Sequence, residues 1–271
     1  MDRCSQTFSL LSEQDQIQIL ATSIGDCRFK LPQSVIYQSL DIADAEQCKK
    51  VLNDFAPNAL INAAAFTKVD ACEDKQAFCD LINITGVSNL IAAIGNKKIH
   101  FVHISTDFIY EGDEEEYFEN SKVNPLSYYG SSKWKSEQLF KNVAFPYSIL
   151  RTVLVFGVLE DSSHSNIVLW AKRALEKGKK INVVHDQYRC PTLAEDLALA
   201  CLQVIQENAT GVFHVSGKDF LSILELVFEI ADYWNLDKRL IYSVSTSSLS
   251  QKAKRPPRTK LNLSRAKKLF K

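Results

Sequence analysis

Short apolar runs alternate with amphipathic stretches through the first half of the chain. The stretch 44–55 carries Ala45, Cys48, Val51 and Phe55 at helical spacing, and Asp44 stands where an N-cap is expected. Apolar runs of strand length lie at 17–20, 59–62, 99–104 and 147–151. Helical stretches lie between or after them at 44–55, 80–95 and 128–142. Strands that alternate with helices of about 10–15 residues predict βαβ units and a doubly wound α/β fold with a parallel sheet.

The alternation of short apolar runs with helical stretches becomes less regular after Gly157. Helices are expected at 166–177, 192–206 and 222–234, with strands at 181–184 and 211–215. Thr192 is the expected N-cap of the second of these helices, and Glu195, three residues later, would complete a capping box. We divide the chain into a first part, 1–156, and a smaller second part, 157–271. Within the second part, 181–206 is expected to pack with the first.

Composition is that of an ordinary soluble globular protein, with 46% hydrophobic and 24% charged residues among 271. No apolar run approaches the ~20 residues of a membrane span. The first twenty residues lack a basic segment followed by an apolar core, so a secretory signal is not expected. The seven cysteines form no Cys-x-x-Cys, and no His/Cys cluster has metal-ligand spacing. We therefore expect reduced thiols in a cytoplasmic protein, with no metal site.

The net charge of zero hides an uneven distribution. Residues 1–150 carry 13 basic and 20 acidic side chains, whereas residues 151–271 carry 19 and 12. The last twenty residues hold nine bases and no acid. A basic region favours an anionic ligand or partner. On charge alone, a solvated basic face is the simpler interpretation.

Tyr129 and Lys133 stand four residues apart at the start of an expected helix, so their side chains share one face. An ordinary tyrosine has a pKa of about 10. A lysine cation one turn away favours the phenolate and is expected to lower the pKa of Tyr129. Such a tyrosine can exchange a proton with a substrate oxygen near neutral pH. The spacing alone is weak, because it occurs by chance in many proteins.

Residues at the ends of two expected strands extend the candidate site around Tyr129 and Lys133. Thr106 closes a central strand, 23 residues before Tyr129, and Asn62 with the alanines after it closes the preceding strand. In a parallel sheet, ligands bind beyond the carboxyl ends of the strands. A hydroxyl at Thr106 can therefore reach the same substrate oxygen, and small residues after Asn62 let a flat cofactor approach the backbone. Each of these features taken alone is equally explained as a turn or a packing residue, but the three together predict an active site.

These segments resemble those of a known family. From about Leu10 to the C-terminus, the chain is similar to extended short-chain dehydrogenase/reductases of the dTDP-4-dehydrorhamnose reductase type. The segments that carry the resemblance are DI (41–42), LINAAAFTKVDACE (60–73), HISTD (103–107), NPLSYYGSSK (124–133), RT (151–152), DQYRCPT (186–192) and RP (255–256). The resemblance implies a Rossmann-like doubly wound parallel sheet, with a smaller C-terminal substrate-binding part.

The resemblance also implies roles for the matching positions. Tyr129 would protonate a C4 keto oxygen as hydride arrives from a nicotinamide, Lys133 would tune Tyr129 and hold the nicotinamide ribose, and Thr106 would polarise the keto group. The positions implied for the cofactor are Asp41, Ile42, Asn62, Ala63, Ala64, Tyr129 and Lys133. Asp107 and Arg255 would contact the substrate, and the basic second half would bind its diphosphate.

The chain departs from the family pattern in two places. The family opens with a strand and a Gly-x-x-Gly-x-x-Gly turn that approaches the cofactor pyrophosphate, but this chain has no glycine before Gly25. Residues 1–11 resemble the first helix alone, so we expect weak NADPH binding and exposed edges on the neighbouring strands. Leu154 also stands where an aromatic residue near the sugar is expected. Ala21-Thr22-Ser23, which has no acid, favours NADPH over NADH.

Two functions from different classes follow. The first is NAD(P)H-dependent reduction of a nucleotide-linked 4-keto-6-deoxysugar by a cytoplasmic enzyme, with a homodimer as a possible assembly and no nucleic-acid or membrane partner. The alternative is a non-catalytic, dehydrogenase-like regulatory subunit that has lost the phosphate loop. The family includes such a subunit of methionine adenosyltransferase. The presence of Thr106, Tyr129 and Lys133 favours the enzyme, since a site without catalytic activity has no chemical need for all three. A third hypothesis is an epimerase or dehydratase with the same fold.

Overall fold

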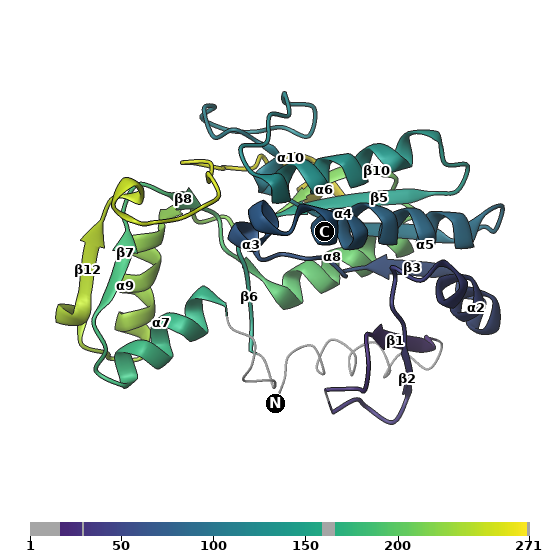
Figure 1. Ribbon diagram of the computed structural model, residues 1–271, viewed down its shortest axis with the longest axis horizontal. Helices are drawn as coiled ribbons and strands as arrows, with labels where there is room; N and C mark the ends of the chain where they lie inside the picture. The colour runs from purple at the N-terminus through teal and green to yellow at the C-terminus, as the bar shows by residue number, and fades with distance from the viewer. Residues whose placement is uncertain (1–16, 29, 159–165, 270–271) are drawn as a thin grey trace.

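A computed structural model describes residues 17–28, 30–158 and 166–269. The helix expected at 1–11 lies outside these ranges. The described chain forms two lobes, a larger one built on a parallel sheet and a smaller one built mainly from later residues (Figure 1).

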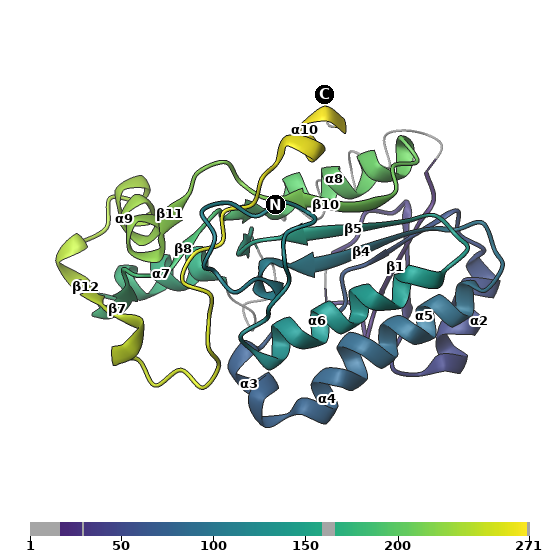
Figure 2. The same ribbon diagram turned by 90° about the horizontal axis from the view of Figure 1, so that it is seen from above.

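The larger lobe is centred on a four-stranded parallel sheet in the order β10-β5-β4-β3. Its strands are β3 (Ala59–Asn62), β4 (His100–Thr106), β5 (Tyr147–Thr152) and β10 (Gly211–Val215). Figure 2 shows α5 (Gly86–Ile94) and α6 (Tyr128–Gln138) on one face of this sheet and α8 (Ala194–Gln206) on the other. This arrangement confirms the Rossmann-like doubly wound fold.

Each face of the sheet carries its own core because successive strand residues point to opposite sides. Phe101 and Ile149 pack with α5 and with α2 (Ala45–Phe55). Their neighbours Val102 and Leu150 pack with α8 on the other face. Asp44 caps α2 as expected, since its carboxylate accepts from the N–H groups of Glu46 and Gln47.

Two further strands lie beside this sheet without joining it. β1 (Ile19–Ser23) and β2 (Val35–Ser39) form a separate parallel pair. Among the residues that the structure describes, no strand pairs with the second edge of β1 or the outer edge of β3. Ile36 and Ile61 are 56% and 45% exposed.

The smaller lobe has its own apolar core. It is built from α7 (Ile167–Glu176), β7 (Ile181–Val184), α9 (Ile223–Tyr233) and β12 (Ile241–Val244). Here the structure differs from the expectation that all of 181–206 packs with the first part. β7 pairs with β12 in the smaller lobe, whereas α8 packs on β4 and β5. β10 also returns from the later residues to the main sheet, so the two lobes interleave along the chain.

The expected capping box at the start of α8 is wrong. The helix begins at Ala194 with Leu193 at its N-cap and no capping bond from a side chain. The Thr192 hydroxyl instead donates to the carbonyl of Val153, 2.7 Å away. A capping box is found instead at the start of α9, where the Ser222 hydroxyl accepts from the N–H of Glu225 while Glu225 accepts from the N–H of Ser222.

The C-terminal segment 251–263 runs from the smaller lobe back to the larger one and ends in α10 (Ser264–Leu269) near β10 (Figure 1). Ion pairs join this segment to acidic residues of the first half. They are Lys252 with Asp74, Arg255 with Asp70 and Lys260 with Glu116. The uneven charge of the sequence is therefore partly balanced inside the molecule, between its two halves.

Within the part of the chain that the structure describes, one helical stretch, Gln76–Ile94, is long and apolar enough by composition to cross a membrane. It comprises α4 (Gln76–Asp80), a π-helical turn (Leu81–Thr85) and α5. Val87, Leu90 and Ile94 of this stretch are buried beside α2 in the core. In all, 33% of the apolar window is buried inside the structure.

Candidate active site

The start of α6 lies against the turn that follows β4. The Ser127 hydroxyl caps the helix by accepting from the N–H of Gly130, at 3.2 Å. A Cβ on Gly130 would lie 2.2 Å from the carbonyl oxygen of Phe108, so only glycine permits this approach. As a result, the ring of Tyr129 packs edge-on against Phe108, with 5.8 Å between centroids. The local sequence thus brings Tyr129 to the end of β4.

Tyr129 is 8% exposed and hydrogen-bonded to Thr106. Burial raises the pKa of Tyr129, and the hydrogen bond to Thr106 only partly offsets that effect. The net shift of the Tyr129 pKa is therefore upward, opposite to the lowering that was expected from Lys133. A phenol with a raised pKa keeps its proton at neutral pH and is a proton donor.

Lys133 is 2% exposed, and its ammonium donates to the carbonyl of Ile104 at 2.7 Å. Burial lowers the pKa of Lys133 to about 8, although Glu137 acts in the opposite direction. The ammonium is therefore mostly charged at pH 7. It has three N–H donors, so donors remain for a ligand.

Thr106 ends β4, and Asp107 begins the 3-10 turn that follows it (Asp107–Ile109). The Thr106 hydroxyl donates to Asp107 at 3.2 Å, and the Thr259 hydroxyl donates to the second carboxylate oxygen at 2.5 Å. The Arg189 Nε lies 3.6 Å from that oxygen. Burial raises the pKa of Asp107, while Arg189 lowers it. Asp107 is thus a buried carboxylate that joins the end of β4 to two segments of the later chain.

The residues after β3 leave an open surface of small side chains. Asn62 is buried, and its Oδ1 accepts from the N–H of Ala64 at 3.1 Å, which fixes the turn. Ala63 and Ala64 are both exposed. Nothing larger than a methyl group projects from either residue, so a flat ligand can approach the backbone here.

Asp41 and Ile42 lie between β2 and α2. The Asp41 carboxylate accepts from the N–H of Ala43 at 2.9 Å, which makes a tight turn. Ile42 is 8% exposed, belongs to the core and packs against Gly86. The Ile42 side chain is therefore a packing residue in this structure, and Asp41 is the more accessible of the two.

Arg255 does not join the cluster at the end of β4. It pairs with Asp70 of α3 (Val69–Asp74), with 2.7 Å between Nη2 and Oδ2. Arg189, which the sequence analysis did not single out, lies beside Asp107 instead, and its Nη2 donates to the carbonyl of Pro256 at 2.7 Å. The only sequence signal for Arg189 was its place within the segment 186–192.

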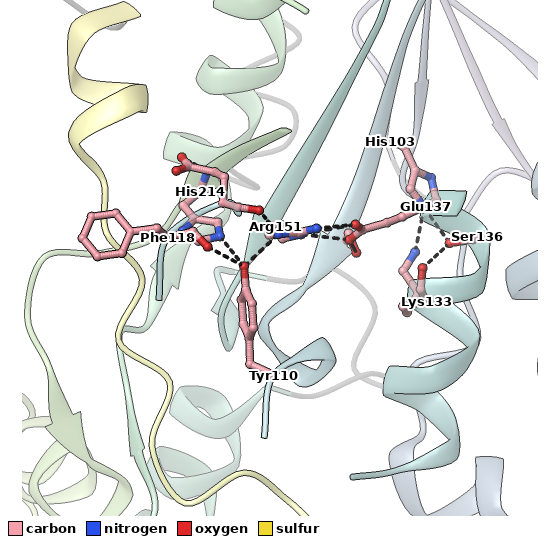
Figure 3. A network of polar contacts seen from close by, with 10 residues as sticks. His103, Tyr110, Phe118, Lys133, Ser136, Glu137, Arg151 and His214 are labelled. Carbon is pink, nitrogen blue, oxygen red and sulfur yellow. Dashed lines mark hydrogen bonds and ion pairs between the residues drawn. The ribbon is translucent and has the colours of Figure 1, made fainter. Parts of the chain in front are cut away.

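A buried polar network continues behind the site (Figure 3). Glu137, one turn after Lys133, pairs with Arg151 of β5 at 2.7 Å, and both side chains are 3% exposed or less. The Arg151 Nη1 donates to the Tyr110 hydroxyl at 2.7 Å, and that oxygen lies 2.8 Å from His214 Nε2. The network ties α6 to β5 and β10. Sequence reasoning missed it because its members lie on four separate segments.

Known proteins are similar to this chain along most of its length. The model of the RmlD substrate binding domain family matches residues 10–271. A dTDP-4-dehydrorhamnose reductase structure from Clostridium acetobutylicum is 33% identical, with a TM-score of 0.78, covering 84% of this chain and 81% of that one. The corresponding structure from Bacillus anthracis, in complex with NADP, is 26% identical, with a TM-score of 0.83 and 94% of each chain covered.

A relative of a different kind is methionine adenosyltransferase 2 subunit beta from Xenopus tropicalis. It is 28% identical over 205 residues, which are 74% of this chain but only 61% of that protein. The family model covers nearly the whole chain and agrees with the motifs and the fold. The chain therefore belongs to the RmlD substrate binding domain family.

Proposed function

We propose that this protein reduces the 4-keto group of a nucleotide-linked 6-deoxysugar with NAD(P)H. The observation that carries the proposal is the placement of Thr106, Tyr129 and Lys133 together at the carboxyl end of β4, beside the open Ala63–Ala64 surface. Relatives named dTDP-4-dehydrorhamnose reductase, one of them in complex with NADP, support it.

The described residues fit a nicotinamide cofactor at one end. Ala63 and Ala64 offer a flat exposed surface, and Lys133 has donors left for ribose hydroxyls. When bound, the cofactor would supply hydride to the keto carbon. Asn62 would hold the surrounding turn, and Asp41 would lie towards the adenine. A glycine turn for the pyrophosphate is not found among the described residues.

The proton comes from the protein's own side chains. Tyr129 is a protonated phenol near pH 7, so its hydroxyl would donate to the keto oxygen as hydride adds to the carbon. Thr106 would polarise the same oxygen by turning its hydroxyl proton from Asp107 to the substrate. The Lys133 ammonium would favour the phenolate left behind once a ligand holds it close to Tyr129. Asp107 would orient the sugar, and Arg255 would contact the diphosphate after leaving Asp70.

Oligomeric state and location belong to the same proposal. We propose a cytoplasmic location, and we carry the homodimer forward as the assembly to be tested. Sedimentation velocity with the full chain would test the assembly, and a monomer at micromolar concentration would contradict it.

The direct test follows NADPH oxidation by the purified chain in the presence of a dTDP-4-keto-6-deoxyhexose. We expect turnover that requires both reactants and yields the 4-hydroxy sugar. Cofactor binding, measured separately by fluorescence, distinguishes a missing cofactor site from a missing reaction. Bound NADPH without any reduction would refute the reductase. It would favour the alternative, a regulatory subunit, which the same chain should reveal by binding a methionine adenosyltransferase catalytic subunit.

A further inference from the structure

We propose that His103 is a positioning residue that joins the cofactor-facing end of β3 to the turn of α6 carrying Lys133, through a one-directional chain of hydrogen bonds. The positioning role of His103 towards the cofactor rests on the proposed function, whereas the chain of hydrogen bonds rests on the geometry alone. His103 lies within β4, between these two elements, and is fully buried (Figure 3).

The Asn62 end of the chain sets the role of one ring nitrogen. Asn62 Oδ1 accepts from the N–H of Ala64, so the amide nitrogen Nδ2, which can only donate, points to His103 Nδ1 at 3.4 Å. A donor opposite a ring nitrogen requires that nitrogen to be the acceptor. His103 Nδ1 therefore carries no proton.

The α6 end sets the role of the other nitrogen independently. The Ser136 hydroxyl donates its single proton to the carbonyl of Lys133, at 2.7 Å. Only the lone pairs of Ser136 Oγ are then left for His103 Nε2, 3.0 Å away. His103 Nε2 must therefore be the donor. Both ends assign the same tautomer, neutral with its proton on Nε2.

The surroundings of the ring hold this tautomer. Burial and the neighbouring Lys133 ammonium, whose Nζ lies 3.3 Å from Nε2, keep the pKa of His103 well below its usual range. The rings of Phe101 and Phe140 lie 6.4 and 5.4 Å from the imidazole between centroids and limit its rotation. An imidazolium would turn Nδ1 into a donor that faces the donor of Asn62.

The tautomer of His103 determines which acceptor the Lys133 ammonium uses. Because Nε2 bears a proton, it cannot accept from the ammonium 3.3 Å away, and Lys133 donates to the Ile104 carbonyl instead. The bonds run from Ala64 through Asn62, His103 and Ser136 to the Lys133 backbone. They set the separation between the exposed alanine surface and the ammonium, which are the two features expected to hold one cofactor.

The first experiment measures the tautomer without reference to activity. Long-range ¹H–¹⁵N correlation spectra of the full chain, with His103 assigned from its loss in His103→Gln, should show an Nε2–H imidazole that does not change between pH 6 and 8. A proton on Nδ1, or an imidazolium in that range, would overturn the proposal. This result stands even if no keto sugar is reduced.

The second experiment compares matched histidine variants in NADPH titrations. His103→Phe keeps a planar aromatic ring and removes both hydrogen bonds, so we expect a Kd about tenfold higher, the scale of one net hydrogen bond. His103→Gln, which keeps an amide N–H towards Ser136, should lose less. His100→Phe is the control, because it makes the same substitution at a buried histidine of the same strand, whose Nε2 bonds to Ser148.

The outcomes separate positioning from general damage. Thermal melts identify any variant that fails to fold, and His103→Gln then carries the comparison with His100→Phe. Equal effects of the His100 and His103 variants on cofactor affinity would overturn the positioning role. If the parent chain itself binds no NADPH, the proposed function fails, while the tautomer measurement still decides the hydrogen-bond chain.

Discussion

Asp70 and Arg255, 185 residues apart, form a two-pronged ion pair with N–O distances of 2.7 and 3.1 Å. Asp70 belongs to α3 of the larger lobe, and Arg255 to the segment that returns from the smaller one. The hydrogen bond from Arg255 lowers the pKa of Asp70, so the pair persists at neutral pH. A diphosphate and the Asp70 carboxylate would compete for the same guanidinium.

This competition predicts opposite effects of two substitutions on nucleotide affinity. Asp70→Asn frees Arg255 and should tighten binding of a nucleoside diphosphate several-fold, whereas Arg255→Ala should weaken it by roughly tenfold. Calorimetry at low and high salt would measure both, and affinity should fall as salt screens the phosphate contacts. If both variants weaken binding equally, the pair acts only as a structural link between the lobes.

The same pair predicts a direction of pH dependence. The folded-state pKa of Asp70 is depressed, so its contribution to stability is present above the unfolded value of about 4 and is lost as pH falls through the folded value. Thermal melts of the parent and Asp70→Asn should therefore converge in acid. Because Asp70 is partly exposed, the difference at neutral pH should stay within the ~1 kcal/mol of surface pairs.

Tyr129→Phe should abolish most of the proposed reduction. The variant keeps the ring against Phe108 and removes only the donor hydroxyl, so kcat should fall by roughly 10²–10⁴-fold without loss of the fold. Tyr128→Phe is the matched control on the same helix, because its hydroxyl bonds to Asp80 outside the site. Steady-state kinetics and melts would compare them. More than half of the parent activity in Tyr129→Phe would remove Tyr129 from the mechanism.

Lys133→Met should separate stability from activity. Burial lowers the pKa of Lys133 to about 8 from 10.5, so the charged form is disfavoured by folding. Replacement by a chain of similar length should leave the melting temperature equal or higher while activity is lost.

The pH dependence of Lys133→Met has a definite sign. Between pH 8 and 10.5 the unfolded chain binds more protons at this site than the native chain, so the contribution of Lys133 to native stability rises with pH. The melting advantage of Lys133→Met should therefore shrink across that window. An advantage that grows with pH would contradict the assignment of a disfavoured buried ammonium.

Gly130→Ala should disturb the site through the backbone. The added methyl would lie 2.2 Å from the Phe108 carbonyl oxygen, so α6 or the 106–109 turn must move. We expect a loss of about 1–3 kcal/mol in unfolding free energy, together with a lower kcat as Tyr129 leaves Thr106. Ser131→Ala, on the next residue of α6, is the control. Denaturant melts and kinetics would show whether both quantities fall together in the glycine variant alone.

Glu137→Gln should be strongly destabilising because it leaves the buried Arg151 guanidinium without its counter-charge. Breaking a buried pair on one side costs about 3–5 kcal/mol. Asp54→Asn breaks the exposed pair with Lys50 and should cost less than about 0.5 kcal/mol. A comparable small effect in both variants would show that the Glu137–Arg151 pair is replaceable by solvent.

The main elements and the candidate active site were readable from the sequence for local reasons. Helical spacing in 44–55 and the short apolar runs of the strands are properties of neighbouring residues, and the structure has α2, β3, β4 and β5 where those patterns predicted them. Tyr129 and Lys133 share a helix face by spacing alone, and a parallel sheet brings the ends of β3 and β4 to one edge.

The tertiary structure decided what depends on distant partners. Whether β7 would join the main sheet or pair with β12 depended on residues 60 positions away. Arg255 found Asp70 across 185 residues, and Arg189 took the place beside Asp107. Burial reversed the pKa shift expected for Tyr129, because desolvation depends on the packed surroundings, which spacing does not determine. Local pattern thus determined the elements and the reactive residue types, while packing determined their partners and protonation states.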